Sequence, residues 1–339
     1  MALKSSSPTT GVTRRWAPVQ VFAAVGAALA LFELYILVKW ISGPNFQEVP
    51  SGPSVPPAWM ATGMRVVEIV GPVAALVLIY RFIVVPWRRE RRIPLDGQLV
   101  IAALAISPYD PASQFFRPWF AYNAYFFNRG TAVSELPGWQ SFTEPGAQTA
   151  WPVFFIVPLY PVFFLAIPAL TCAIMRRARN RWPHVHPIAL VALAYVTIFV
   201  IDSLLEACVI MRMGWYEHSG WSFPFLDSYY GHNALRNIIF VALTVTGATC
   251  LRFFVNDRGE TFVERGANRL GTVGAKVTAV RGLAVYAAIL GIMSFGYHIP
   301  MAILSLLAKD VTWHPSMVDN SYLNDHLCGF GTPRSCPPN

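Results

Sequence analysis

The hydrophobic positions of this chain gather into long unbroken runs, and the polar positions are largely confined to short segments between them. A run of about 20 apolar residues is long enough to cross the hydrocarbon core of a bilayer as a helix. The pattern predicts seven such spans, at residues 17–42, 63–86, 97–116, 149–175, 187–212, 232–255 and 281–307. We therefore expect an all-α fold, a polytopic membrane bundle of about seven transmembrane helices.

Two of the predicted spans have unusual features. The first is longer than the apolar region of a signal peptide, and no small-residue cleavage site follows it, so we expect an uncleaved signal anchor. The third contains Asp110 and two prolines, and residues 116–127 after it could form a re-entrant or interfacial segment. The boundaries of this third span are therefore the least regular.

The composition agrees with a membrane protein. Of the 339 residues, 55% are hydrophobic and only 13% are charged, whereas soluble domains carry about 25% charged residues. Basic residues outnumber acidic ones, 26 to 18, but they cluster beside apolar runs at residues 88–92 and 176–181. Such clusters are typical of cytoplasmic membrane loops, so we expect contact with membrane lipid and none with nucleic acid.

The positions of the basic residues also predict an orientation. With the N-terminus in the cytoplasm, residues 1–15, 88–92, 176–181 and 252–281 are cytoplasmic, and together they hold most of the basic residues. Seven spans then leave the C-terminus outside. We expect a disordered cytoplasmic tail at 1–15, a membrane domain at 16–308 and an extracytoplasmic tail at 309–339.

Two cysteines lie in the exported tail. Cys328 and Cys336 would meet an oxidising compartment, so they either form a disulfide or remain two free thiols. Residues 117–148 and 213–230, predicted outer loops, are rich in aromatic residues. These aromatic side chains either form an interface belt or roof a pocket for an apolar substrate.

Polar residues inside the spans concentrate in the outer half of the predicted bundle. Counting from the cytoplasmic ends places Glu33, Asp110, Asp202, Glu206 and His298 between the bilayer middle and the outer face. Groups near the interface could simply reach water, but short or deep carboxylates cannot do so easily and should face a wet cavity or a partner. Asp202 and Glu206 are four positions apart and share one helix face.

The sequence contains none of the common motifs for metal or nucleotide chemistry, such as HExxH, a P-loop or paired CxxC. We therefore expect no metal and no cofactor. Carboxyl groups that share an apolar cavity can divide the acid and base roles between them. The predicted catalytic residues are Asp202, Glu206 and Asp110, and the predicted substrate-pocket residues are Glu33, Asn123, His232, Arg236 and His298.

Several segments are similar to those of a known family. They are GPNF (43–46), PSGPSVPP (50–57), PWRRERR (86–92), DG (96–97), DP (110–111), YN (122–123), PGW (137–139), the Asp-x-x-x-Glu of the fifth span, NDRGETFVERG (256–266) and DHLCGFGTPRSCP (325–337). Together they resemble the spirocyclase family named after AveC of the avermectin pathway. The resemblance runs from about residue 16 to the end of the chain.

The resemblance implies a cofactor-free cyclase or dehydratase of the bacterial cytoplasmic membrane that acts on a hydrophobic, polyketide-like or lipid-like substrate. Within the family, closure of a dihydroxy-ketone to a spiroketal and a dehydration are the expected reactions. Two other functions stay open from the residues alone. One is a small-molecule or lipid transporter without catalysis, and the other is a scaffold for envelope enzymes that uses the basic loop 256–269. The oligomeric state is also left open.

Overall fold

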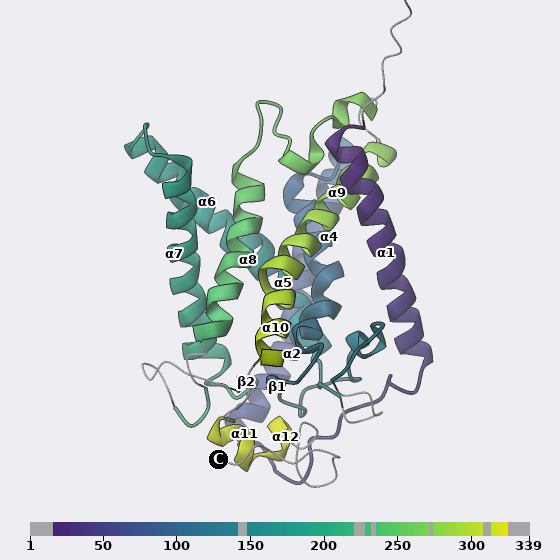
Figure 1. Cartoon of the computed structure of the whole chain (residues 1–339), viewed down its shortest axis with the longest axis vertical. Coiled ribbons are helices and arrows are strands. Elements are labelled where there is room, and N and C mark those ends of the chain that lie inside the picture. The colour runs from purple at the N-terminus through teal and green to yellow at the C-terminus, as the bar shows by residue number, and fades with distance from the viewer. Residues whose placement is uncertain are drawn as a thin grey trace, which may run out of the picture.

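The computed structural model describes residues 16–141, 148–219, 228–231, 235–270, 274–307 and 313–324. This part of the chain folds into a bundle of helices that run between two ends (Figure 1). Six of the described helices are long and apolar enough to cross a membrane: Pro18–Ser42, Ala58–Glu90, Val153–Arg181, Pro187–Ile210, Leu235–Phe253 and Ala275–Leu307. The predicted helical membrane bundle is thus confirmed, with one difference in the third span.

Two of these long helices are α-helical throughout, and the other four are built from consecutive α-helical and π-helical pieces. In chain order they are α1 (Pro18–Ser42), α2 (Ala58–Ile79), η1 (Tyr80–Val84), α3 (Val85–Glu90), α5 (Val153–Pro161), η4 (Val162–Ala166), α6 (Ile167–Arg181), α7 (Pro187–Leu205), η5 (Glu206–Ile210), α8 (Leu235–Phe253), α9 (Ala275–Met293), η8 (Ser294–His298) and α10 (Ile299–Leu307). Proline at the first turn of α1 and α7 suits the helix start, because those amides have no intrahelical acceptor.

The third predicted span, residues 97–116, is only partly α-helical. Helix α4 (Leu95–Ile106) has 12 residues, which makes it about 18 Å long, short of the roughly 30 Å hydrocarbon core. A 3-10 segment, η2 (Ser107–Gln114), continues it, since Pro108 and Pro111 lack the amide hydrogens that an α-helix needs. Residues 116–127 do not form a separate helix but include a short strand, β1 (Phe120–Tyr122).

The remaining elements are short and lie at the two ends of the bundle. They are η3 (Ala132–Glu135), β2 (Tyr216–His218), η6 (Phe262–Glu264), η7 (Ala267–Leu270), α11 (Pro315–Asp319) and α12 (Ser321–Asn324). The strands and α11 and α12 lie at the end opposite to the start of α1 (Figure 1). The basic segments 88–92, 176–181, 252–270 and 274–281 lie at the end where α1 begins. Which end faces the cytoplasm stays a prediction, and residues 1–15, Cys328 and Cys336 lie outside the described residues.

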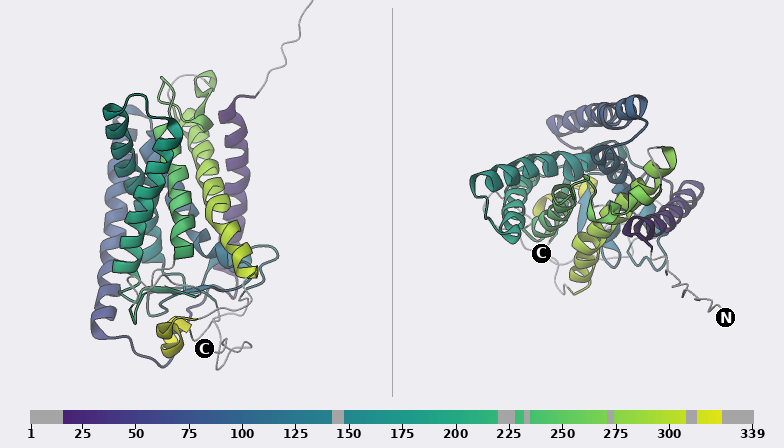
Figure 2. Two further views of the ribbon diagram at one scale, coloured as in Figure 1. Left: turned by 60° about the vertical axis from the view of Figure 1, so that its left-hand side comes forward. Right: turned by 90° about the horizontal axis from the view of Figure 1, so that it is seen from above.

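Helices α1 and α2 stand on the outside of the bundle. Viewed from above, they lie at separate places on its edge (Figure 2), where α1 packs against α9 and α2 against α5. Their outward side chains are apolar, and Leu31 and Leu76 are 68% and 64% exposed. A surface of this kind suits contact with lipid, since most backbone polar groups in the middle of a helix are bonded within the helix.

Four π-helical turns interrupt the long helices. Three of them end two residues before a proline, at Pro86, Pro168 and Pro300. The proline ring would strike a backbone carbonyl in a regular α-helix, and the wider π turn gives it room. The fourth, η5, has no such proline and begins at Glu206. Because π turns occur frequently at functional sites, this one directs attention to Glu206.

The two strands form a small antiparallel pair that covers one end of the bundle. Phe120 faces His218 and Tyr122 faces Tyr216 in the register of the pair. Alternate residues of a strand point to opposite faces, so these four rings share one face of the pair. Glu217 belongs to the other face. The strand pair therefore presents an aromatic face to the interior of the helix bundle.

Candidate active site

A cavity lies inside the bundle, against the aromatic face of the strand pair. Its walls come from α5, η4, η5, α8, α9, η8, η2 and both strands. The space open to the centres of water-sized molecules is about 80 Å³, several times the roughly 10–15 Å³ that one water needs. Its polar and aromatic lining residues are Asp110, Phe120, Tyr122, Tyr160, Phe163, Phe164, Glu206, Tyr216, His218, Asn237, Thr244 and Tyr297.

Asp110 enters the cavity from η2 and is held by two tyrosine hydroxyls. Tyr160 donates a hydrogen bond to Oδ1 at 2.7 Å, and Tyr122 donates to Oδ2. Burial raises the pKa of Tyr122 well above its usual range, so its hydroxyl remains a donor. Two donors that point at one carboxyl group fix its orientation and stabilise its ionised form.

Glu206 enters the same cavity from η5 and is held in a similar way. The Asn237 amide donates to Oε2 at 2.7 Å, and the Tyr297 hydroxyl donates to the Asn237 carbonyl oxygen at 2.7 Å. Tyr216 is also hydrogen-bonded to Glu206, and burial raises the pKa of this tyrosine well above its usual range. The chain of bonds from Tyr297 through Asn237 fixes which atom of the amide is nitrogen.

The cavity therefore brings together two of the three predicted catalytic residues, Asp110 and Glu206, and they interact electrostatically. The third, Asp202, is fully buried but does not line the cavity. Neither of its carboxyl oxygens has a hydrogen-bond partner among the described residues. It interacts electrostatically with Glu206, one helical turn further along the chain.

Two of the predicted pocket residues have partners elsewhere. Glu33 is buried between α1 and α9, where the Tyr286 hydroxyl donates to it at 2.6 Å. Asn123 is fully buried and donates to the Gly214 carbonyl oxygen at 2.9 Å, which connects β1 to the turn before β2. Neither residue lines the cavity. Their contacts indicate roles in holding segments together.

Two more predicted pocket residues, Arg236 and His298, are not among those that line the cavity either. The Arg236 guanidinium lies over the Trp119 ring, 5.5 Å from its centroid. His298 is buried, and its Nε2 has no hydrogen-bond partner among the described residues. His232 lies outside the described residues. The functional roles of the predicted site residues remain predictions.

The tyrosines that hold the two carboxyl groups were not predicted from the sequence. Tyr122 and Tyr216 belong to the aromatic outer loops, for which an interface belt and a pocket roof were both open. Their place in the cavity wall agrees with the pocket roof. Aromatic residues at alternate positions, 120 and 122 and again 216 and 218, were the available signal of a strand with one aromatic face.

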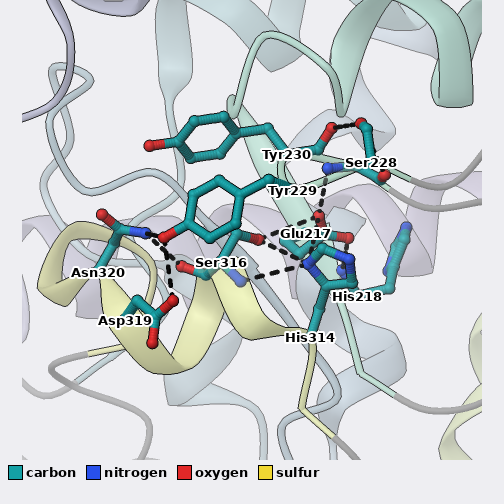
Figure 3. Close-up of polar contacts among 10 residues, drawn as sticks. Glu217, His218, Ser228, Tyr229, Tyr230, His314, Ser316, Asp319 and Asn320 are labelled. Carbon is teal, nitrogen blue, oxygen red and sulfur yellow. Dashed lines mark hydrogen bonds and ion pairs between the residues drawn. The ribbon is translucent and has the colours of Figure 1, made fainter.

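A C-terminal cap, defined here as residues 313–324 with α11 and α12, packs on the outside of the strand pair. Figure 3 shows its contacts with Glu217, the buried residue on the outer face of β2. The Ser316 hydroxyl lies 3.4 Å and His314 Nδ1 3.6 Å from Glu217 Oε2, which also accepts the Gly231 amide at 2.8 Å. The Ala124 amide, just after β1, donates to the Tyr322 carbonyl oxygen at 2.7 Å. The cap thus supports both strands from the side away from the cavity.

Comparison with known proteins identifies the family. A sequence profile described as Spirocyclase AveC-like matches residues 90–322, more than half of the chain. Every residue that lines the cavity lies within the matched region. Searches of the curated proteins and of the solved structures gave no match. The chain belongs to the AveC-like spirocyclase family.

Proposed function

We propose that the protein is a membrane-embedded, cofactor-independent cyclase or dehydratase in which Asp110 and Glu206 carry out acid–base catalysis on a hydrophobic, polyketide-like or lipid-like substrate. One observation carries the proposal: two carboxyl groups from distant segments line one cavity, each held by hydrogen-bond donors. A held carboxyl group can give or take a proton without first reorienting. The family supports the reaction class.

For spiroketal formation, one substrate hydroxyl first adds to the ketone to give a hemiketal. The protonated carboxyl group then gives its proton to the hemiketal hydroxyl, and the C–O bond breaks to release water and an oxocarbenium-like cation. The second substrate hydroxyl attacks the cationic carbon while the ionised carboxylate takes its proton. The dihydroxy-ketone has lost one water, and the proton now rests on the other carboxyl group.

A proton must pass back between Asp110 and Glu206 before the next turnover. The cavity has room for several waters, which can carry this proton and accept the water released. Dehydration would use the same groups on other bonds. The base would remove a proton from the carbon beside the alcohol, and the acid would protonate the departing hydroxyl.

The apolar part of the cavity wall suits a hydrophobic substrate. Ile156, Leu159, Ile210, Val241 and Met293 line it together with the aromatic rings. Walls of this kind bind hydrocarbon without directional bonds, so orientation depends on the few polar groups. Holding the substrate hydroxyl near the ketone removes much of the entropic cost of ring closure. In this proposal Asp202 acts indirectly, through its charge interaction with Glu206.

Purified protein in detergent tests the proposal against transport. The substrate is a symmetrical dihydroxy-ketone that can close two six-membered rings, and the readout is the handedness of the spiroketal at neutral pH. An enzyme with an asymmetric pocket should give an excess of one hand, whereas spontaneous closure gives both equally. A transporter would be favoured if the two enantiomers form in equal amounts at the rate seen without protein, and if a proton gradient drives uptake of the ketone into proteoliposomes.

A further inference from the structure

The cavity wall has the composition of a site for positive charge. It contains seven phenylalanine and tyrosine rings and two carboxyl groups. Among the described lining residues there is no lysine or arginine, and His218 is the only side chain that can become cationic. Arg236 stacks on Trp119 and is not part of the lining. The fixed charges of the wall therefore favour a cation and oppose an anion.

The aromatic rings add to the effect of the carboxyl groups. The face of an aromatic ring carries negative potential, and it attracts a cation most strongly when water is excluded. Phe164 stacks on Tyr160 with a centroid distance of 5.8 Å, and Tyr160 donates to Asp110. This part of the wall thus combines ring faces with a carboxylate.

We propose that the cavity selectively binds small organic cations and does not bind carboxylates. The cations that it prefers are rings with a positive charge on one ring atom. The identity of the natural cation rests on the proposed function. If that function holds, the natural cation is the oxocarbenium-like species. The part of the substrate that enters the cavity is then neutral before reaction and carries no free carboxylate. A protonated cyclic amine mimics that cation in charge and shape.

Calorimetric titration of the detergent-solubilised protein tests the selectivity with three probes. They are N-methylpiperidine, which is protonated at neutral pH, tetrahydropyran, which is neutral, and cyclohexanecarboxylate, which is an anion. We expect the amine to bind roughly 10- to 30-fold more tightly than tetrahydropyran, and the carboxylate not to bind. Equal affinities for the amine and the ether, or binding of the carboxylate, would overturn the proposal. This test needs only the protein without substitutions.

Two variants locate the binding. Phe164→Leu removes a ring from the cavity wall, and Phe126→Leu removes a buried ring that stacks on Phe155 but does not line the cavity. Phe164→Leu should weaken amine binding about 3- to 10-fold and leave ether binding unchanged. Phe126→Leu should bind both probes as the unaltered protein does. An equal loss in both variants would place the amine elsewhere and overturn the proposal.

The outcomes also separate this inference from the proposed function. Selective amine binding without handed spiroketal formation would support the cation site and contradict the enzyme. Handed product without selectivity for the amine would support the enzyme and contradict the cation site. Inhibition of product formation by the amine, with no effect of tetrahydropyran, would connect the two.

Discussion

The Asn237 amide donates a 2.7 Å hydrogen bond to the Glu206 carboxylate across the interface between α8 and η5. Through its carbonyl oxygen the same amide accepts the Tyr297 hydroxyl, so three segments meet at one side chain. Glu206 itself lies at the start of a π turn that no proline explains. Its position in the cavity therefore depends strongly on Asn237.

Asn237→Asp should impair both folding and turnover. The new carboxyl group cannot donate to Glu206 when ionised, and it places like charge against it. We expect product formation to fall at least roughly 10-fold, which corresponds to about 1.4 kcal/mol, measured as the initial rate of handed spiroketal formation. Asn180→Asp, which adds a carboxyl group at an exposed position of α6, is the control. Equal rates in the two variants would contradict the role of Asn237.

Tyr160→Phe tests the support of Asp110. The change removes one of the two donors to this carboxyl group and leaves the ring in place. A lost bond to a charged group costs about 1.5–3 kcal/mol, so we expect a roughly 10- to 100-fold lower rate. Tyr195→Phe is the control, since that hydroxyl is 3.4 Å from a backbone carbonyl oxygen away from the cavity. If both variants retain the full rate, the tyrosine clamp on Asp110 has no part in catalysis.

Gly296→Ala tests how closely α8 approaches η8. A Cβ at this position would lie 2.6 Å from Thr244 Oγ1, which forces the two helices apart beside the cavity. We expect a loss of stability of about 1–3 kcal/mol, seen as a lower midpoint of thermal unfolding in detergent. A Cβ at Gly291, on the preceding turns of α9, meets no atom within 4 Å, so Gly291→Ala should be neutral or stabilising by up to about 1 kcal/mol. A stable Gly296→Ala protein would contradict the tight packing of these helices.

Glu217→Gln tests the attachment of the C-terminal cap to the strand pair. The amide would replace a carboxylate oxygen that accepts the Gly231 amide and lies near Ser316 and His314. Loss of that acceptor costs about 1–3 kcal/mol, so the backbone amides of residues 313–324 should exchange with deuterium faster. Asp319→Asn changes an exposed contact of the cap with Tyr229 and should leave exchange almost unchanged. Identical exchange in both variants would show that Glu217 does not hold the cap.

The long helices could be predicted from the sequence because they depend on a local pattern. An apolar run of sufficient length needs a helix in lipid whatever surrounds it. Residues 97–116 form the exception, since their two prolines were visible but their run of apolar residues suggested a full span. The local rule about proline was the stronger one, and the helix ends at Ile106.

The membership of the candidate site could not be predicted from spacing alone. Four positions on a helix correspond to a rise of about 6 Å, so Glu206 can line a cavity that Asp202 does not reach. The meeting of Asp110 with Glu206 depends on how η2 packs against its neighbours, and the aromatic roof depends on pairing between strands almost 100 residues apart. Such relationships arise from tertiary packing, on which the periodicity of one segment has no bearing.

Initial rates of handed spiroketal formation by Asp110→Asn, Glu206→Gln and the double variant test the central claim most directly. Each single change should lower the rate by roughly 10²- to 10⁴-fold, and the double variant should lose little more because the two groups act together. Glu135→Gln, a change at a buried carboxylate that pairs with Lys39 away from the cavity, should keep the rate. Full activity in Asp110→Asn and Glu206→Gln proteins that fold and accumulate normally would contradict catalysis by these carboxyl groups.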